Sequence, residues 1–131
     1  MRIGHEHLEQ SAFFDWVNYN IGLYPALSLM YAIPNGGMRP SDTNDRGKRF
    51  SVIAQKMKEE GVRRGVLDIH LPFALGDYIG MWIEMKWGKN TLTEEQEWWV
   101  KNLREAGHYV AVCYSCEEAI AVTIYYLNLK G

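Results

Sequence analysis

The spacing of apolar residues changes along this chain, and it predicts an alternation of helices and strands. Apolar residues recur every three to four positions, as on one face of an amphipathic helix, in residues 6–17, 45–60, 93–106 and 115–126. Short apolar runs typical of buried strands occupy residues 27–33, 66–71, 79–87 and 109–114. The order α-β-α-β-β-α-β-α predicts an α/β fold with a central mixed β-sheet flanked by helices.

The predicted strand at residues 79–87 carries two charged residues, Glu84 and Lys86, two positions apart. Alternate side chains of an extended strand share one face, so these two groups point the same way while Met85 points into the core. Buried sheets rarely hold a carboxylate and an ammonium side by side without a functional reason. The pattern therefore marks this strand as the place to look for a site.

Asp68 supplies a partner for this pair. If the strands before and after Gly76 are antiparallel neighbours, Asp68 lies opposite Glu84, because both are eight residues from the turn. Two carboxylates that meet repel each other, and a hard divalent cation such as Mg²⁺ or Mn²⁺ relieves this repulsion. Such a cation polarises a phosphoryl oxygen and activates water, while Lys86 would orient the water or balance charge on the phosphate. The spacing predicts a site for phosphodiester hydrolysis.

The composition is that of a soluble globular protein with a single domain, residues 1–131. Hydrophobic residues make up 47% of the chain, which at this length suffices for a buried core. The sequence contains no apolar run of the roughly 18–20 residues that a membrane helix needs. Residues 1–6 lack the apolar segment of a signal peptide. We therefore expect a cytoplasmic protein with no membrane partner.

Charge is distributed unevenly along the chain. The net charge of -2 excludes a globally basic nucleic-acid binder. Eight of the fourteen Lys and Arg residues nevertheless fall between Arg39 and Arg64, against four acidic residues there. Such a bias permits a local basic face, although on charge alone a solvated helix surface is the simpler explanation.

The two cysteines, Cys113 and Cys116, form a C-x-x-C motif. Such a motif can be redox-active or form half of a zinc site. The chain has no second cysteine pair, and the motif begins in a predicted strand, so we favour buried structural thiols. A thiol redox or zinc protein is the alternative that this motif leaves open.

Five short segments resemble, in order and spacing, the VRR-NUC family of the PD-(D/E)XK nuclease superfamily. They are residues 9–10, 33–37, 60–68, 83–86 and 92–96. The resemblance extends from about Glu6 to Leu127 and is greatest to the stand-alone form of phages and bacteria. Leu67 departs from the pattern, because the family usually has proline before the aspartate. Proline supplies no ligand, so we expect no loss of chemistry.

The resemblance implies a restriction-endonuclease-like fold and assigns roles to the site residues. Asp68 and Glu84 would be ligands of Mg²⁺ or Mn²⁺, with the backbone carbonyl of Met85 as a third ligand. Lys86 would be the catalytic lysine. Similar stand-alone domains are homodimers that act on branched DNA, including four-way (Holliday) junctions, in the cytoplasm of bacterial or phage-infected cells.

Two assisting residues have simpler structural interpretations as well. Glu9 resembles the acid that the family's first helix brings to the site, although an acid on a helix flank is usually just solvated. Gln96 resembles the family's glutamine on the helix after the E-x-K strand. Thr93 and Gln96 also have the spacing of a capping box, in which Gln96 bonds to the helix start. The two roles of Gln96 are compatible.

Four further residues have open roles in the sequence. His70 shares the face of Asp68, so it either lines the site or lies in its wall. Asn35, in a glycine turn, contacts the site or, as we favour, only shapes the turn. His5 and His7 have the spacing of a chelating pair but are more simply exposed residues near the N-terminus.

Arg63, Arg64 and Lys89 lie on predicted loops that border the site. There they would hold the DNA backbone through salt-dependent and largely sequence-independent contacts. No base-reading motif is present, which favours recognition of DNA shape, and a two-fold dimer would place two sites on opposed strands. We predict a Mg²⁺- or Mn²⁺-dependent endodeoxyribonuclease, structure-specific on branched DNA such as four-way junctions. The alternative is a non-catalytic DNA-binding module of the same fold.

Overall fold

The computed structural model describes residues 4–34 and 47–130, without the side chains of residues 47–51. Its elements, in chain order, are α1 (His5–Tyr19), the 3-10 helix η1 (Pro25–Leu29), β1 (Tyr31–Ala32), α2 (Gly47–Glu59), β2 (Ile69–Leu71), β3 (Met81–Met85), α3 (Glu94–Ala106), β4 (Tyr109–Cys113) and α4 (Cys116–Leu127). The predicted order of helices and strands is confirmed. In the described part of the chain, no helix is both long enough and apolar enough to cross a bilayer.

The four strands form one mixed sheet in the order β1-β2-β3-β4. β2 pairs with its neighbours β1 and β3 in antiparallel fashion, whereas β3 and β4 are parallel. In the β2–β3 pair, Ile69 lies opposite Ile83 and Leu71 opposite Met81. One step further along this register stands Asp68 opposite Glu84, as the sequence predicts.

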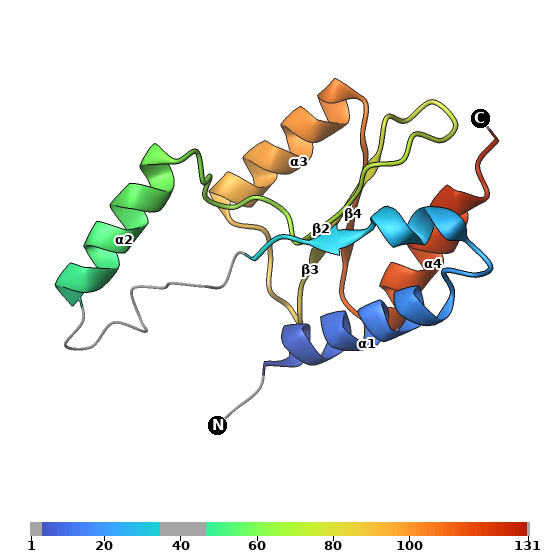
Figure 1. Cartoon of the computed structure of the whole chain (residues 1–131), viewed down its shortest axis with the longest axis horizontal. Helices are drawn as coiled ribbons and strands as arrows, with labels where there is room; N and C mark the ends of the chain where they lie inside the picture. The colour runs from blue at the N-terminus through green and yellow to red at the C-terminus, as the bar shows by residue number, and fades with distance from the viewer. Residues whose placement is uncertain (1–3, 35–46, 131) are drawn as a thin grey trace.

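Helices cover both faces of the sheet (Figure 1). On one face, α1 and α4 pack over a buried cluster that includes Phe13, Ile83 and Tyr126. On the other, α3 packs over a smaller cluster around Leu67 and Val100, together with aromatic and aliphatic side chains from its surroundings. Figure 1 also shows α2 standing apart from the sheet. Because strand side chains alternate, β3 serves both layers.

The predicted strand at residues 27–33 is wrong except for Tyr31–Ala32. Residues 25–29 instead form η1, with Pro25 in its first position. Leu27 and Met30, three residues apart, are both buried, which suits the three-residue turn of a 3-10 helix. The Ser28 hydroxyl donates a hydrogen bond of 2.8 Å to the Pro25 carbonyl. An apolar run of this length can therefore be buried in a helical turn as well as in a strand.

α3 begins at the predicted capping box and ends at the predicted glycine. The Thr93 hydroxyl accepts a hydrogen bond from the Gln96 N–H, and the Gln96 side chain accepts one from the Thr93 N–H, which completes a capping box. Gly107 ends the helix with a φ of 111°. These caps fix where α3 begins, and with it the position of Gln96.

Gly65 brings the loop before β2 against the start of α3. Its φ is +75°, and a Cβ added there would lie 2.5 Å from the Cβ of Glu95. The loop is further tied to the helix because the Trp99 indole Nε1–H donates a hydrogen bond of 2.9 Å to the Arg64 carbonyl. Asp68 follows Gly65 by three residues, so this contact helps to set its position.

Gly65→Ala is expected to destabilise the domain more than Gly61→Ala. Both glycines have positive φ, but a Cβ at Gly61 would meet nothing within 4 Å. The Gly61 change should cost about 1–2 kcal/mol for the left-handed backbone. The Gly65 change should cost a further ~1–3 kcal/mol for the collision with Glu95. Urea unfolding measures both, and equal losses would contradict this account of the loop contact.

Candidate active site

Backbone N–H groups of Asp68 and Met85 hold the carboxyl groups of Glu84 and Asp68 in place. The Asp68 N–H donates a hydrogen bond of 3.2 Å to Glu84 Oε1. The Met85 N–H, next along β3, donates one of 2.9 Å to Asp68 Oδ2. These two bonds continue the β2–β3 register, and they place the two carboxyl groups near one end of β3.

Lys86 and Gln96 converge on the same oxygen of Glu84. The Lys86 Nζ lies 3.6 Å from Glu84 Oε2. The Gln96 side-chain Nε2 donates a hydrogen bond of 2.7 Å to that oxygen, while its Oε1 caps the helix at Thr93. Gln96 therefore makes both contacts that its sequence position suggested, because its amide has a donor and an acceptor end.

Glu84 carries its carboxyl group in a buried and electrostatically strained position. Only 2% of the surface of Glu84 and 8% of that of Lys86 is exposed to solvent. The pKa of Glu84 is raised to about 8, chiefly by burial and then by the negative charge of Asp68, while the positive charge of Lys86 opposes both. One lysine therefore does not offset the cost of holding two carboxylates here.

A divalent cation is the kind of group that would relieve this strain. Among the described residues, no three His, Cys, Asp or Glu side chains gather into a metal-holding group. A cation here would take Asp68 and Glu84 as its side-chain ligands and complete its shell with backbone and water oxygens. Mg²⁺ is commonly bound in this way, by one or two carboxylates with several waters retained. The residues present fit Mg²⁺ or Mn²⁺, with the Met85 carbonyl as the predicted backbone ligand.

Glu9 makes its hydrogen bond elsewhere. Its Oε1 accepts a hydrogen bond of 2.9 Å from the backbone N–H of Cys116, the first residue of α4. An acid at a helix N-terminus is favourable there because of the unpaired N–H groups and the helix dipole. The structure thus gives Glu9 a role in joining α1 to α4, and its contribution to the site stays a prediction.

The family model described as the VRR-NUC domain matches residues 31–117, more than half of the chain. This chain belongs to the VRR-NUC domain family. The matched stretch contains Asp68, Glu84, Lys86 and Gln96, whereas Glu9 precedes it. Together with the sheet and its helices, membership implies a nuclease-like fold.

A solved structure titled "VRR_NUC domain protein" resembles this VRR-NUC domain over nearly its whole length. The two are 21% identical with a TM-score of 0.74, and the match covers 99% of this chain and 93% of the other. At this identity the likeness concerns the fold. No curated protein matches the chain.

His70 packs among aromatic side chains of this VRR-NUC domain, and its part in the site stays a prediction. Its ring stacks on Trp82 at 4.0 Å between centroids, and its Nδ1 lies 2.7 Å from the Tyr31 hydroxyl. Burial lowers the pKa of His70, and His108 lowers it further, so the ring stays neutral near pH 7. His5 stacks on the Trp87 ring. Asn35 lies outside the described residues.

The two thiols are poorly placed for redox chemistry. The pKa of Cys113 is raised to about 12, chiefly by burial and then by the negative charge of Glu118. Burial also raises the pKa of Cys116, which is half-buried. Because the thiolate is the reactive form, these raised pKa values disfavour reaction of either thiol. This supports the interpretation of the motif as structural.

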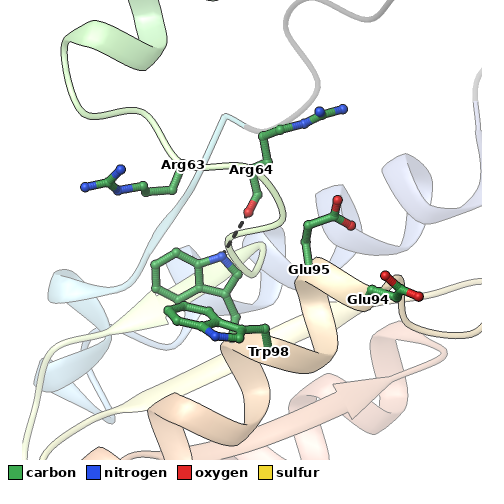
Figure 2. A pocket seen from close by; sticks show the side chains of 6 residues that line it. Arg63, Arg64, Glu94, Glu95 and Trp98 are labelled. Carbon is green, nitrogen blue, oxygen red and sulfur yellow. Dashed lines mark hydrogen bonds between the residues drawn. The ribbon is translucent and has the colours of Figure 1, made fainter.

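The predicted DNA-binding residues Arg63, Arg64 and Lys89 are all exposed. Figure 2 shows Arg63 and Arg64 on the loop above the start of α3, with their guanidinium groups pointing apart. Sequence reasoning missed what lies beneath them, namely Trp98 and its neighbour on α3. The signal was present: adjacent helix residues point about 100° apart, so two consecutive tryptophans do not both face the same core.

Proposed function

We propose that this VRR-NUC domain is a metal-dependent endonuclease that hydrolyses phosphodiester bonds in DNA. The observation that carries the proposal is the buried carboxyl of Glu84 next to the half-buried carboxyl of Asp68, with Lys86 beside them. Buried like charges are costly to the fold. They would also repel the phosphates of DNA, so a module that only binds DNA has no use for them. A hydrolytic site does, because it needs a cation at the phosphate.

Mg²⁺ or Mn²⁺, when bound, would polarise a phosphoryl oxygen and lower the pKa of the attacking water. Asp68 and Glu84 would hold the ion, and their crossed backbone hydrogen bonds keep both carboxylates in position. Gln96 fixes the orientation of Glu84 through its amide. Lys86 would orient the attacking water or balance the charge that develops on the phosphate.

The proposed substrate is branched DNA, including four-way junctions, cut by a homodimer. Exposed Arg63, Arg64 and Lys89 would hold phosphates around the site without reading bases. A single small domain has little surface with which to measure a junction, whereas a two-fold dimer presents two sites to two strands.

Incubation with labelled linear, flapped and four-way DNA, each with Mg²⁺, Mn²⁺ or EDTA, tests the proposal. We expect cleavage with either ion, none in EDTA, and the fastest cleavage on branched DNA. Cleavage that persists in EDTA would overturn the metal mechanism. Binding of junctions without any cutting would favour the binding-module alternative. A gel-filtration mass of one chain would contradict the dimer.

A further inference from the structure

A hollow of about 680 Å³ lies between the loop before β2 and the first turns of α3 (Figure 2). Its volume falls within the ~300–1,000 Å³ typical of small-molecule sites. It is lined by two arginines, two acids and two aromatic residues: Arg63, Arg64, Glu94, Glu95, Trp98 and Trp99.

Trp98 lines this hollow and packs against Trp99, which is itself held in place by a hydrogen bond. The Trp98 and Trp99 rings meet edge to face at 5.1 Å and 88°. Trp99 is itself anchored by its hydrogen bond to the Arg64 carbonyl. Trp98 keeps 58% of its surface exposed, which is unusual for so large an apolar side chain. The arrangement offers a supported aromatic surface to solvent.

The charged groups of the hollow are also available to a ligand. In the part of the chain that the structure describes, neither Arg63 nor Arg64 forms an ion pair, although Glu94 and Glu95 line the same hollow. The two positive and two negative charges cancel, so a phosphate alone is a poor match. A nucleotide is a better one, because arginine binds its phosphate, tryptophan stacks on its base and a carboxylate accepts from an exocyclic amino group.

The hollow borders the candidate active site. Glu95 precedes Gln96, whose amide contacts Glu84, and Gly65 packs against Glu95 three residues before Asp68. Gln96 and Trp98 are two residues apart, so their side chains point about 200° apart around α3. The hollow therefore adjoins the site through Gly65 and Glu95, and a strand whose phosphate reaches the carboxylates would cross the start of α3 to enter it.

We propose that this hollow binds an unpaired nucleotide of the DNA next to the cleaved bond, with its base stacked on Trp98. Arg63 or Arg64 contacts the flanking phosphate, and Glu94 or Glu95 accepts from the amino group of the base. The inference rests on the proposed nuclease function and narrows its substrate to DNA with a single-stranded segment. It also gives the site a preference for amino-bearing bases such as cytosine over thymine.

Fluorescence anisotropy in EDTA, with labelled oligo-dC, oligo-dT and a fully paired duplex, tests the proposal without cleavage. Trp98→Ala should weaken oligo-dC binding roughly 5- to 150-fold, the range for loss of one stacked base. Trp98→Phe should recover most of that loss, and duplex binding should not change. Tyr19→Ala is the matched control, because Tyr19 is an 89% exposed aromatic residue on α1. We expect it to bind like the wild type.

The paired change Glu94→Gln and Glu95→Gln tests the acids separately. It should abolish the preference for oligo-dC over oligo-dT, and it decides the question if Trp98→Ala does not fold. Two results would overturn the base-binding role: unchanged oligo-dC binding by Trp98→Ala, or equal binding of oligo-dC and oligo-dT by the wild type. If the wild type still cleaves DNA in either case, the proposed nuclease function is unaffected. A wild type that neither binds nor cuts any DNA would overturn both proposals.

Discussion

Replacing Lys86 by methionine should slow DNA cleavage by about 10²–10³-fold, the usual cost of losing one group that stabilises transition-state charge. The methionine side chain fills a similar volume, so the buried position beside Glu84 stays packed. What is lost is the ammonium group that lies 3.6 Å from Glu84 Oε2. Single-turnover cleavage rates on the best substrate with Mg²⁺ measure the effect.

Lys101→Met is the matched control for this change. Lys101 is exposed on α3 and loses the same charge away from the carboxylates. It should cleave at the wild-type rate. Lys86→Met should also keep its affinity for DNA, because the loss lies in the chemical step. A Lys86→Met protein that cleaves as fast as the control would refute the catalytic role of the lysine.

Glu84→Gln should stabilise the metal-free domain near pH 9 and leave it almost unchanged near pH 5. The pKa of Glu84 is raised from 4.5 to about 8 on folding, chiefly by burial and then by Asp68. Between these values the folded state binds more protons than the unfolded state, so wild-type stability falls as the pH rises from 4.5 through 8. Glutamine does not titrate and escapes this loss.

The expected gain near pH 9 is on the order of 3 kcal/mol. The pKa difference alone corresponds to about 5 kcal/mol at ~1.36 kcal/mol per unit. The glutamine amide returns ~1–2 kcal/mol of this, because its NH₂ faces a hydrogen-bond donor. Urea unfolding in EDTA across this pH range measures it, with exposed Glu105→Gln on α3 as control. A gain that is equal at both ends of the range would disprove the buried-charge account.

The placement of Asp68, Glu84 and Lys86 was predictable, because strand periodicity and the position of a turn together determine the register of two strands. Gly76 marked the turn, and equal distances from it placed Asp68 opposite Glu84. Alternation then assigned Lys86 to the same face. The start of α3 was equally local, since a capping box depends on residues three positions apart.

Other features depend on contacts between distant segments, and no local pattern contains them. Glu9 accepts a hydrogen bond from the N–H of Cys116, which lies 107 positions away in the sequence. The need for glycine at position 65 arises from the side chain of Glu95 across the loop. The exposed face of Trp98 likewise follows from how that loop meets α3. These are the places where tertiary packing, rather than sequence periodicity, decides the structure.

Calorimetric titration with Mn²⁺ tests the central claim, that Asp68 and Glu84 form a divalent-cation site. The comparison is between wild type and Asp68→Asn, which preserves the side-chain shape and an acceptor for the Met85 N–H. Asp77→Asn, an exposed change in the β2–β3 turn, is the control. We predict that wild type and Asp77→Asn bind Mn²⁺ alike and that Asp68→Asn binds it at least ~10-fold more weakly. Equal Mn²⁺ binding by all three proteins, or none by the wild type, would contradict the account.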